Sequence, residues 1–386
     1  MGHAYINIFV AIMIFSLIGL LSGVVNGVKP VVAVLGTFDY VKYFLVIFIY
    51  GAFFRDLNEV KKIFRILLII AIGIGTIYLI QEIWALTSRY LLGKDITDQS
   101  IYIFTDLYDF PGSLMAIDFN NRWESGIYKA LYVFTNSYLS GLYFLYFFTL
   151  YFFMNKKKNI AVLIPLLSGI FVSVSRMVYT SLVLIVTSYI FKDSKYRKWF
   201  IVLIIPVLIV LTYMSFIVAD MDSIKVGSSQ VEMSFRSYSR TKSVEIWKDN
   251  VFLGVGPGMF GGRISINTMS PIYSEYNFDG KEYNFLKNKA HGIDQFWPQI
   301  IAETGLVGML AFLALISILI KTLLTVMSSI DHDEVRDLLL GLVSFFIAFI
   351  IYLLGSGLNI TVILFTFLAF IGMGFGCSAH CLRSSS

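Results

Sequence analysis

Several stretches of this chain run for about twenty residues or more without a charged side chain. Residues 4–25 and 130–154 are two of them, and both consist mainly of apolar and aromatic residues. A helix needs about 20 apolar residues to cross the hydrocarbon core of a membrane. The strands of a transmembrane barrel would instead alternate apolar and polar residues with a period of two. These unbroken runs therefore predict membrane-spanning helices.

The composition of the whole chain agrees with lipid as its solvent. Hydrophobic residues make up 57% of the 386 residues and charged residues 14%, and the mean hydropathy is +0.77. Soluble domains carry about 25% charged residues, so a soluble fold would have no interior large enough for this apolar surface. We expect an all-α polytopic membrane protein of about ten transmembrane helices. The predicted spans lie near residues 4–25, 38–54, 66–87, 130–154, 160–175, 177–191, 200–219, 300–327, 338–355 and 358–376.

The basic residues in the short connections between spans predict the orientation of the chain. Four of these connections carry clusters of lysine and arginine, and with ten spans all four fall on one side. The positive-inside rule makes that side the cytoplasm, where both termini then lie. The four basic connections are at 55–65, 156–158, 192–198 and 321–336.

Two long segments then face outward and set the domain organisation. Connections of this length usually carry function. We divide the chain into residues 1–219 with seven spans and an external loop at 88–129, residues 220–298 as a large external loop, residues 299–376 with spans eight to ten, and residues 377–386 as a cytoplasmic tail.

The two cysteines near the C-terminus cannot build a disulfide framework, and spare thiols are favoured over a metal site.

The second external loop is rich in basic residues and supports two interpretations. One is a set of solvated surface lysines, because long translocated loops are largely exempt from the charge bias. The other is an anion site, because Arg236 and Arg240 supply guanidinium groups whose paired donors match the oxygens of a phosphate or pyrophosphate. The residues alone leave both interpretations open.

Charged residues also lie in or beside the apolar runs. Arg176 falls between two spans almost without a loop, so it either extends to the lipid headgroups or points into a polar cavity. Glu303 lies near the start of the eighth span, where an acidic residue is favourable at a helix N-terminus, and this interpretation outweighs catalysis. Asp39 and Lys42 are three residues apart, share a helix face and are predicted to pair.

A glycine-rich run at 254–262 indicates a sharp turn rather than a nucleotide site. Pro257 removes an amide donor, and the run lacks the Gly-Lys-Ser/Thr ending of a phosphate loop. Before this run, Val244, Trp247 and Val251 recur at helical spacing and are predicted to pack on the membrane surface. Two acidic pairs are interpreted as solvated rather than as metal ligands: Asp220 with Asp222, and Asp331 with Asp333.

Several of these features occur in an order that resembles the C-terminal signature of the O-antigen polymerase and ligase superfamily. Earlier pieces fit as well, at 122–126, 134–137 and 175–176, so the resemblance covers most of the chain. The matching residues of the signature are Phe235, Arg236 and Arg240, the run Ile246-Trp-Lys-Asp-Asn-Val-Phe-Leu-Gly-Val-Gly-Pro-Gly-Met-Phe, and the run Asp294-Gln-Phe-Trp-Pro-Gln-Ile-Ile-Ala-Glu-Thr-Gly-Leu-Val-Gly.

The resemblance implies a multi-span, GT-C-like glycosyltransferase at the outer face of the bacterial inner membrane. Its donor and acceptor would be glycans carried on undecaprenyl pyrophosphate, with membrane lipid and a chain-length regulator protein as candidate partners and no nucleic acid. Ligases of the family usually carry a histidine where this chain has Asp294, with His291 one turn earlier. This departure resembles the polymerases more closely.

The resemblance and the residue chemistry together suggest a role for each candidate. Asp294 is predicted to be the general base and His291 is the second candidate, although Asp294 can also be the N-cap of the eighth helix and His291 an ordinary loop residue. The expected reaction requires neither a metal nor a cofactor. The arginines predicted to hold the pyrophosphate are Arg176, Arg236 and Arg240, with Arg122 and Arg263 as further candidates.

The predicted function is the polymerisation of lipid-linked oligosaccharide repeat units into O-antigen or a related surface polysaccharide. A ligase that transfers finished glycan to lipid A core is the nearest alternative. A flippase or transporter would also explain the spans and the charges, but such carriers rarely have so long an external loop, and no inverted repeat is evident in the sequence.

Overall fold

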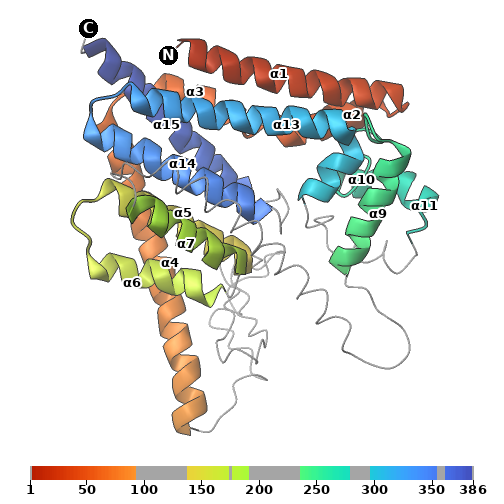
Figure 1. Ribbon diagram of the computed structural model, residues 1–386. Coiled ribbons are helices and arrows are strands. Elements are labelled where there is room, and N and C mark those ends of the chain that lie inside the picture. The colour runs from red at the N-terminus through yellow and green to blue at the C-terminus, as the bar shows by residue number, and fades with distance from the viewer. Residues whose placement is uncertain are drawn as a thin grey trace. The chain divides into compact units, whose positions relative to one another are not determined.

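The computed structural model describes residues 2–92, 137–173, 176–190, 235–278, 296–353 and 361–384. Within these ranges every regular element is a helix (Figure 1), which confirms the all-α class for the described part of the chain. The chain divides into two compact units. Unit 1 comprises Met1–Arg55, Pro206–Asp331 and Ile350–Ser386, and unit 2 comprises Asp56–Ile205 and His332–Phe349.

Unit 1 begins with three apolar helices. The first, α1 (Gly2–Val25), agrees with the first predicted span. The second, α2 (Pro30–Val41), has proline at its start, where the missing amide costs no helical hydrogen bond. The third, α3 (Leu45–Phe53), follows α2 at a bend of 51°. The second predicted span, 38–54, is therefore a bent pair of helices that begins at Pro30.

Two later helices complete the framework of unit 1. One, α13 (Phe296–Ser328), packs along α1, and the other, α15 (Thr361–Ser384), packs along α3 (Figure 1). The contact between α3 and α15 is close, because a Cβ atom on Gly372 would overlap the carbonyl oxygen of Ile47. Glycine allows helix backbones to approach in this way in membranes.

The C-terminal end of α15 extends into the segment predicted to be a tail. Residues 377–384 continue the helix as far as Ser384, and Cys377 is buried. The Ser378 hydroxyl donates to the carbonyl of Gly374, one turn earlier, at 2.6 Å. The segment contains no proline that would end the helix, so both cysteines lie on α15.

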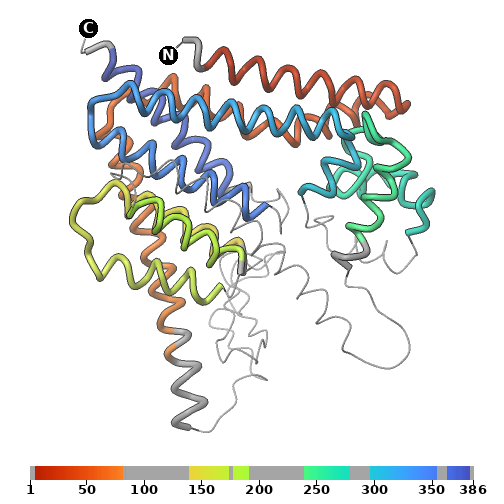
Figure 2. The backbone as a smooth tube through the Cα atoms, in the orientation of Figure 1, coloured from red at the N-terminus to blue at the C-terminus, as the bar shows by residue number. Residues whose placement is uncertain are grey.

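Residues 235–278 of unit 1, part of the predicted large external loop, form a compact cluster of short helices (Figures 1 and 2). The cluster contains α9 (Phe235–Asp249), α10 (Arg263–Asn267) and α11 (Ile272–Glu275). It has a small hydrophobic core that extends to Ala302 of α13, so it is anchored to the helical framework of unit 1. The core consists of Ile246, Val255, Phe260, Ile266, Ile272, Tyr273, Phe278 and Ala302.

Unit 2 is a bundle of helices with a core rich in aromatic residues. Its members α5 and α4 pack on α6, and α7 packs on α5. Phe144 is fully buried and contacts the ring of Tyr78, and Tyr146 contacts Phe345. The helices of unit 2 are α4 (Leu57–Leu92), α5 (Ser137–Met154), α6 (Ile160–Val172), α7 (Arg176–Ile190) and most of α14 (Asp333–Leu353).

The helices identify the chain as a polytopic membrane protein. Within the described residues, five helices are long and apolar enough to cross a membrane, or six if the bent pair of α2 and α3 counts as one span. Helices α5, α6 and α7 are apolar but shorter. The predicted span at 200–219 lies outside the described residues, so the number of ten spans and the orientation of the chain stay predictions. The five long candidates contain Tyr5–Val25, Leu57–Ile80, Phe296–Ser328, Asp333–Leu353 and Ile363–Leu382.

Candidate functional site

The most distinctive backbone feature of unit 1 is a break in α13 at Gly305. This residue has φ 63° and ψ −166°, a conformation that is essentially restricted to glycine. The break separates a short N-terminal segment of α13, residues 296–304, from the long remainder of the helix (Figure 1). Such a break leaves helical amide and carbonyl groups without their usual partners, and these groups must be satisfied elsewhere.

The glycine loop, residues 254–262, and the two residues at 251 and 252 supply those partners. Amides of the loop donate to the carbonyls that precede Gly305, and amides that follow Gly305 donate back to the carbonyls before the loop. The amide and carbonyl groups left without helical partners at the break are thereby satisfied by backbone groups next to the cluster of short helices, which is distant in the sequence. The four bonds are Val255 N to Ala302 O at 2.9 Å, Gly256 N to Glu303 O at 2.8 Å, Leu306 N to Val251 O at 2.8 Å, and Val307 N to Phe252 O at 3.1 Å.

The glycine loop needs its glycines for two reasons. Four of them have positive φ: Gly254, Gly256, Gly258 and Gly261. In addition, a Cβ atom on Gly254 would lie 2.5 Å from the carbonyl oxygen of Ala302, in contact with backbone that could not move away. The sharp turn predicted from the glycine run is confirmed, and its role in pairing with the broken helix could not be seen in the sequence.

Two polar residues at the C-terminal end of α1, one within the helix and one just after it, also bind this junction. The Ser22 hydroxyl donates to the carbonyls of Leu253 and Glu303, the latter at 3.3 Å. The Asn26 side-chain amide donates to the carbonyl of Gly254 at 2.9 Å. These bonds join α1, the glycine loop and α13 at one place, and sequence reasoning did not find either residue.

Glu303 lies at the centre of the junction and is only 1% exposed. Its Oε2 accepts a hydrogen bond from the Tyr40 hydroxyl at 2.6 Å, and its Oε1 accepts one from the Phe260 amide at 2.9 Å. A buried carboxyl group is costly unless hydrogen bonds compensate for its lost hydration, and here both oxygens accept one. Glu303 therefore connects α2, α13 and the glycine loop.

The sequence interpretation of Glu303 as an acidic residue near a helix N-terminus was wrong. The first turn of α13 contains no acidic residue, because the helix starts at Phe296, and Glu303 lies two residues before the break. The partner residue Tyr40 gave no signal in the sequence, since it lies 263 positions away. The nearby pair of Asp39 and Lys42 is confirmed, with 2.6 Å between carboxylate and ammonium.

Three of the candidate pyrophosphate ligands lie in unit 1 on the cluster of short helices. Arg240 lies on α9, which packs against α13, and its side chain is half-buried. Arg236 is one turn earlier on the same helix, so the two positions share a face of α9. Arg263 follows the glycine loop directly, is the first residue of α10 and is exposed.

The structure describes less of the other candidate site residues. Arg176 is the first residue of α7 in unit 2, at the junction with α6 that the sequence predicts. The side chains of Arg176 and Arg236 lie outside the described part, as do Arg122, His291 and Asp294 altogether. Asp294 precedes the first residue of α13 by two positions in the sequence, next to the segment that the Glu303 junction holds.

The end of α9 is fixed to α11 by a hydrogen bond between side chains. The Tyr276 hydroxyl, at the end of α11, donates to the carboxylate of Asp249 at 2.9 Å. Burial, together with this bond to Asp249, raises the pKa of Tyr276 to about 12. The hydroxyl therefore remains a hydrogen-bond donor throughout the physiological pH range.

Acidic groups in the described ranges do not gather into a metal site. No group of three or more His, Cys, Asp or Glu side chains there could hold an ion. Asp333 instead pairs with Arg336 at 2.8 Å, while Asp220 and Asp222 lie outside the described residues. The metal-independent reaction stays a prediction.

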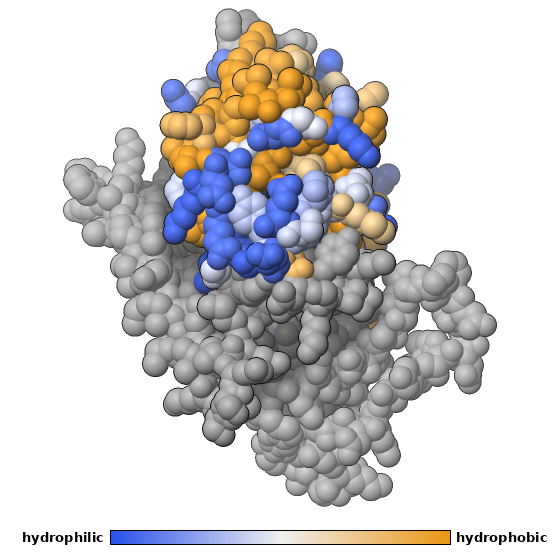
Figure 3. All heavy atoms as spheres, turned by 90° about the vertical axis from the view of Figure 1, so that its right-hand side faces the viewer, coloured by the Kyte–Doolittle hydropathy of each residue, from blue (hydrophilic) through white to orange (hydrophobic). Residues whose placement is uncertain are grey.

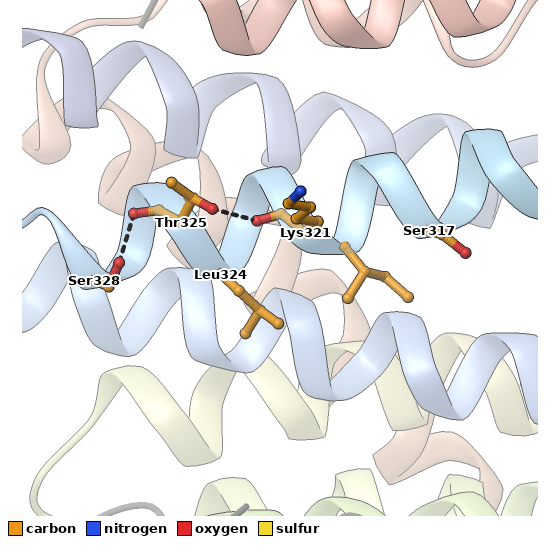
Figure 4. Close-up of a pocket in the computed structure, with 6 residues that line it drawn as sticks. Ser317, Lys321, Leu324, Thr325 and Ser328 are labelled. Atoms are coloured by element: carbon orange, nitrogen blue, oxygen red, sulfur yellow. Dashed lines mark hydrogen bonds between the residues drawn. The ribbon is translucent and has the colours of Figure 1, made fainter.

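A shallow depression on α13 lies away from this junction, toward the C-terminal end of the helix (Figure 4). It is lined by one exposed face of the helix, where the Thr325 hydroxyl donates to the carbonyl of Lys321 at 2.8 Å. None of the candidate site residues lines it. The lining residues are Ser317, Ile320, Lys321, Leu324, Thr325 and Ser328.

An exposed apolar patch links α9 to the long part of α13. Phe252 is 70% exposed, and Val251, Val307 and Leu310 are exposed beside it along the chain segments that the backbone bonds join. The Trp247 indole donates to the carbonyl of Val251 at 3.2 Å. Elsewhere on this end of unit 1, α9 to α11 present a hydrophilic surface below the hydrophobic surface of the longer helices (Figure 3). The patch fits the boundary between lipid and water, where tryptophan is favoured.

We expect an environment-sensitive fluorophore on Phe252→Cys to report lipid. In phospholipid vesicles its emission should shift to the blue and be quenched by brominated acyl chains, because position 252 adjoins the apolar face of the span. The same fluorophore on Asn267→Cys, exposed on α10, should report water and resist quenching. The signal of Cys377 and Cys381 in the unmodified chain is subtracted. Equal quenching at both positions would contradict the location of the boundary.

In the described part of the chain, the helices and the broken span completed by the glycine loop define a class of multi-span membrane proteins rather than one protein. Residues 160–313 match a family model described as O-antigen ligase. The matched region runs from the start of α6 into α13 and includes the glycine loop, Glu303 and Gly305. A search of curated proteins gave no match.

The match confirms the resemblance found in the sequence. Members of this family are glycosyltransferase-like enzymes of O-antigen assembly, which act on lipid-linked glycans in the membrane. The match does not separate ligase from polymerase.

Proposed function

We propose that the protein polymerises oligosaccharide repeat units carried on undecaprenyl pyrophosphate, at the outer face of the bacterial inner membrane. The observation that carries this proposal is the family match over residues 160–313, which includes Asp294. The resemblance seen in the sequence implies a histidine at this position in ligases. The arrangement of unit 1 supports it, because α9 with two of the arginines packs against α13, which begins two residues after Asp294.

In the proposed reaction a growing glycan moves from its lipid pyrophosphate to a hydroxyl of a new lipid-linked repeat. The acceptor oxygen forms a bond to the anomeric carbon, and the bond from that carbon to the pyrophosphate oxygen breaks. Asp294 takes the proton of the hydroxyl, with His291 as the second candidate base. Guanidinium groups of Arg176, Arg236 and Arg240, assisted by Arg122 and Arg263, stabilise the negative charge of the departing pyrophosphate.

The proposal predicts that Asp294→Asn and Arg240→Ala each abolish long-chain glycan while the protein stays in the membrane. Loss of a general base typically lowers a rate by about 10²–10⁴-fold, which leaves no detectable ladder of polymer. Polymer length is measured by gel electrophoresis of surface glycan from complemented cells. The matched control is Lys248→Ala, which removes an exposed cation from the same helix as Arg240 and should leave polymer length unchanged. Normal polymer in both test variants would remove the assigned chemistry.

Ligase activity is the second candidate, and the description of the matching family favours it. The two activities use the same donor chemistry and differ in the acceptor. Cells that lack a polymerase should display single repeats on lipid A core, whereas cells that lack a ligase should accumulate polymer on the lipid carrier. Repeats trapped inside the cell would instead indicate a flippase.

A further inference from the structure

The carboxyl group of Glu303 is placed in the middle of the candidate site and yet has no oxygen to offer a substrate. Both oxygens accept hydrogen bonds from protein donors, Tyr40 on one side and the Phe260 amide on the other, and the group is buried. A group that takes a proton from an acceptor hydroxyl must approach that hydroxyl within hydrogen-bond distance. Glu303 therefore fits a role that acts through its neighbours.

The neighbours of Tyr40 show what is held in place. Its ring contacts the ring of Phe296, the first residue of α13, with 6.1 Å between centroids, and also contacts Phe15 of α1 at 5.8 Å. Its hydroxyl reaches Glu303 two turns later on the same short segment of α13. Tyr40 thus fixes both ends of the segment that directly follows Asp294 in the sequence.

The other oxygen of Glu303 determines the position of the glycine loop. The Phe260 amide that it binds lies three residues before Arg263, and the loop begins five residues after Asp249, the last residue of α9. An apolar side chain of similar size could fill the same volume but would not fix the direction of an amide or a hydroxyl. The carboxyl group sets directions as well as distances among α2, the glycine loop and the start of α13.

We propose that Glu303 and Tyr40 are positioning residues for glycosyl transfer: together they hold the start of α13, which follows Asp294, in register with the glycine loop, which joins the helices that carry Arg240 and Arg263. This inference rests on the proposed function and adds to it the pair that orients the reacting groups. A displacement of about 1 Å at a reacting group can lower a rate by about 10²-fold.

The test uses purified full-length protein in lipid nanodiscs, with a synthetic pyrophosphate-linked repeat as both donor and acceptor. Tyr40→Phe keeps the ring contacts and removes only the hydroxyl, so we expect kcat to fall by about tenfold or more while KM stays within about twofold. Glu303→Gln can still accept from Phe260 and can donate to the Tyr40 oxygen, so it should retain most of kcat. Glu303→Leu should lose at least as much as Tyr40→Phe.

A half-buried tyrosine elsewhere in unit 1 provides the matched control. The Tyr5 hydroxyl is buried and has no hydrogen-bond partner in the described part of the chain. Tyr5→Phe should leave kcat and KM at the wild-type values. Hydrogen exchange of residues 254–262 gives a readout that does not depend on the reaction, and it should become faster in Tyr40→Phe and stay unchanged in Tyr5→Phe.

The outcomes separate this inference from the proposed function. Wild-type kcat in Tyr40→Phe, or an unchanged exchange rate in its glycine loop, overturns the positioning pair whatever reaction the protein catalyses. If Glu303→Gln lowers kcat as much as Glu303→Leu does, the positioning pair is also overturned. The hydrogen bonds that glutamine retains would then have no effect on the reaction. If wild-type protein transfers glycan only to lipid A core, polymerisation is overturned, and the same variants are then compared in that transfer.

Discussion

Replacing Gly305 with alanine should strongly destabilise the folded protein. The backbone conformation there, φ 63° and ψ −166°, costs an alanine about 1–2 kcal/mol or more. The new Cβ would also lie 2.5 Å from the carbonyl oxygen of Phe252, and such overpacking costs about 1–3 kcal/mol. Together these penalties are a large share of the about 5–15 kcal/mol that stabilises a typical protein. The measurement is the fraction of monodisperse protein after detergent extraction, with its melting temperature.

A glycine in a regular helix serves as the control for this substitution. Gly73 lies within α4, and a Cβ atom there would have no neighbour within 4 Å. Gly73→Ala should therefore keep the melting temperature or raise it slightly, since alanine is favoured over glycine in a helix by about 1 kcal/mol. If Gly305→Ala melted like Gly73→Ala, the break in α13 would not have the conformation described here.

Replacing Gly36 with leucine should abolish glycan synthesis along with a large loss of stability. A Cβ atom on Gly36 would lie 2.7 Å from the carbonyl oxygen of Pro257 and closer still to the Gly258 amide, so α2 and the glycine loop meet backbone to backbone. A leucine side chain would push them apart at a cost of about 1–3 kcal/mol or more. The bond from Tyr40 to Glu303, about one turn further along α2, would then lengthen or break.

Polymer length and melting temperature measure this second effect. Val34→Leu, an exposed position on the same helix, is the matched control and should change neither quantity. Wild-type polymer in Gly36→Leu would show that α2 and the glycine loop need not be in contact for transfer.

The sequence predicted those parts of the fold that depend on local pattern. The first and sixth helices begin and end within a few residues of the predicted spans, because uncharged runs flanked by polar residues define them. The ion pair of Asp39 and Lys42 followed from spacing alone. The bend between α2 and α3 was missed, because residues 42–44 contain neither proline nor glycine to mark it.

The candidate site could be predicted only in part, because its bonds join residues that are far apart in the chain. A single glycine within an apolar run, such as Gly305, does not reveal a positive φ, and the glycine run at 254–262, some fifty residues earlier, does not show that it pairs with this position. Ser22 and Tyr40 lie 281 and 263 positions from their partner Glu303. No periodicity connects positions at such separations. The composition of the loop drew attention to α9 and its arginines, whose role stays a prediction.

The contact between α3 and α15 has a consequence for how the chain matures on the ribosome. Leu45–Phe53 leaves the exit tunnel long before Thr361–Ser384 is translated, so the early helix must wait in the translocon or the bilayer for its partner. Its glycine-lined face can meet lipid or a chaperone during this interval. Completion of unit 1 is therefore a late, post-insertion event, and slowing translation should lengthen the lifetime of the half-assembled protein.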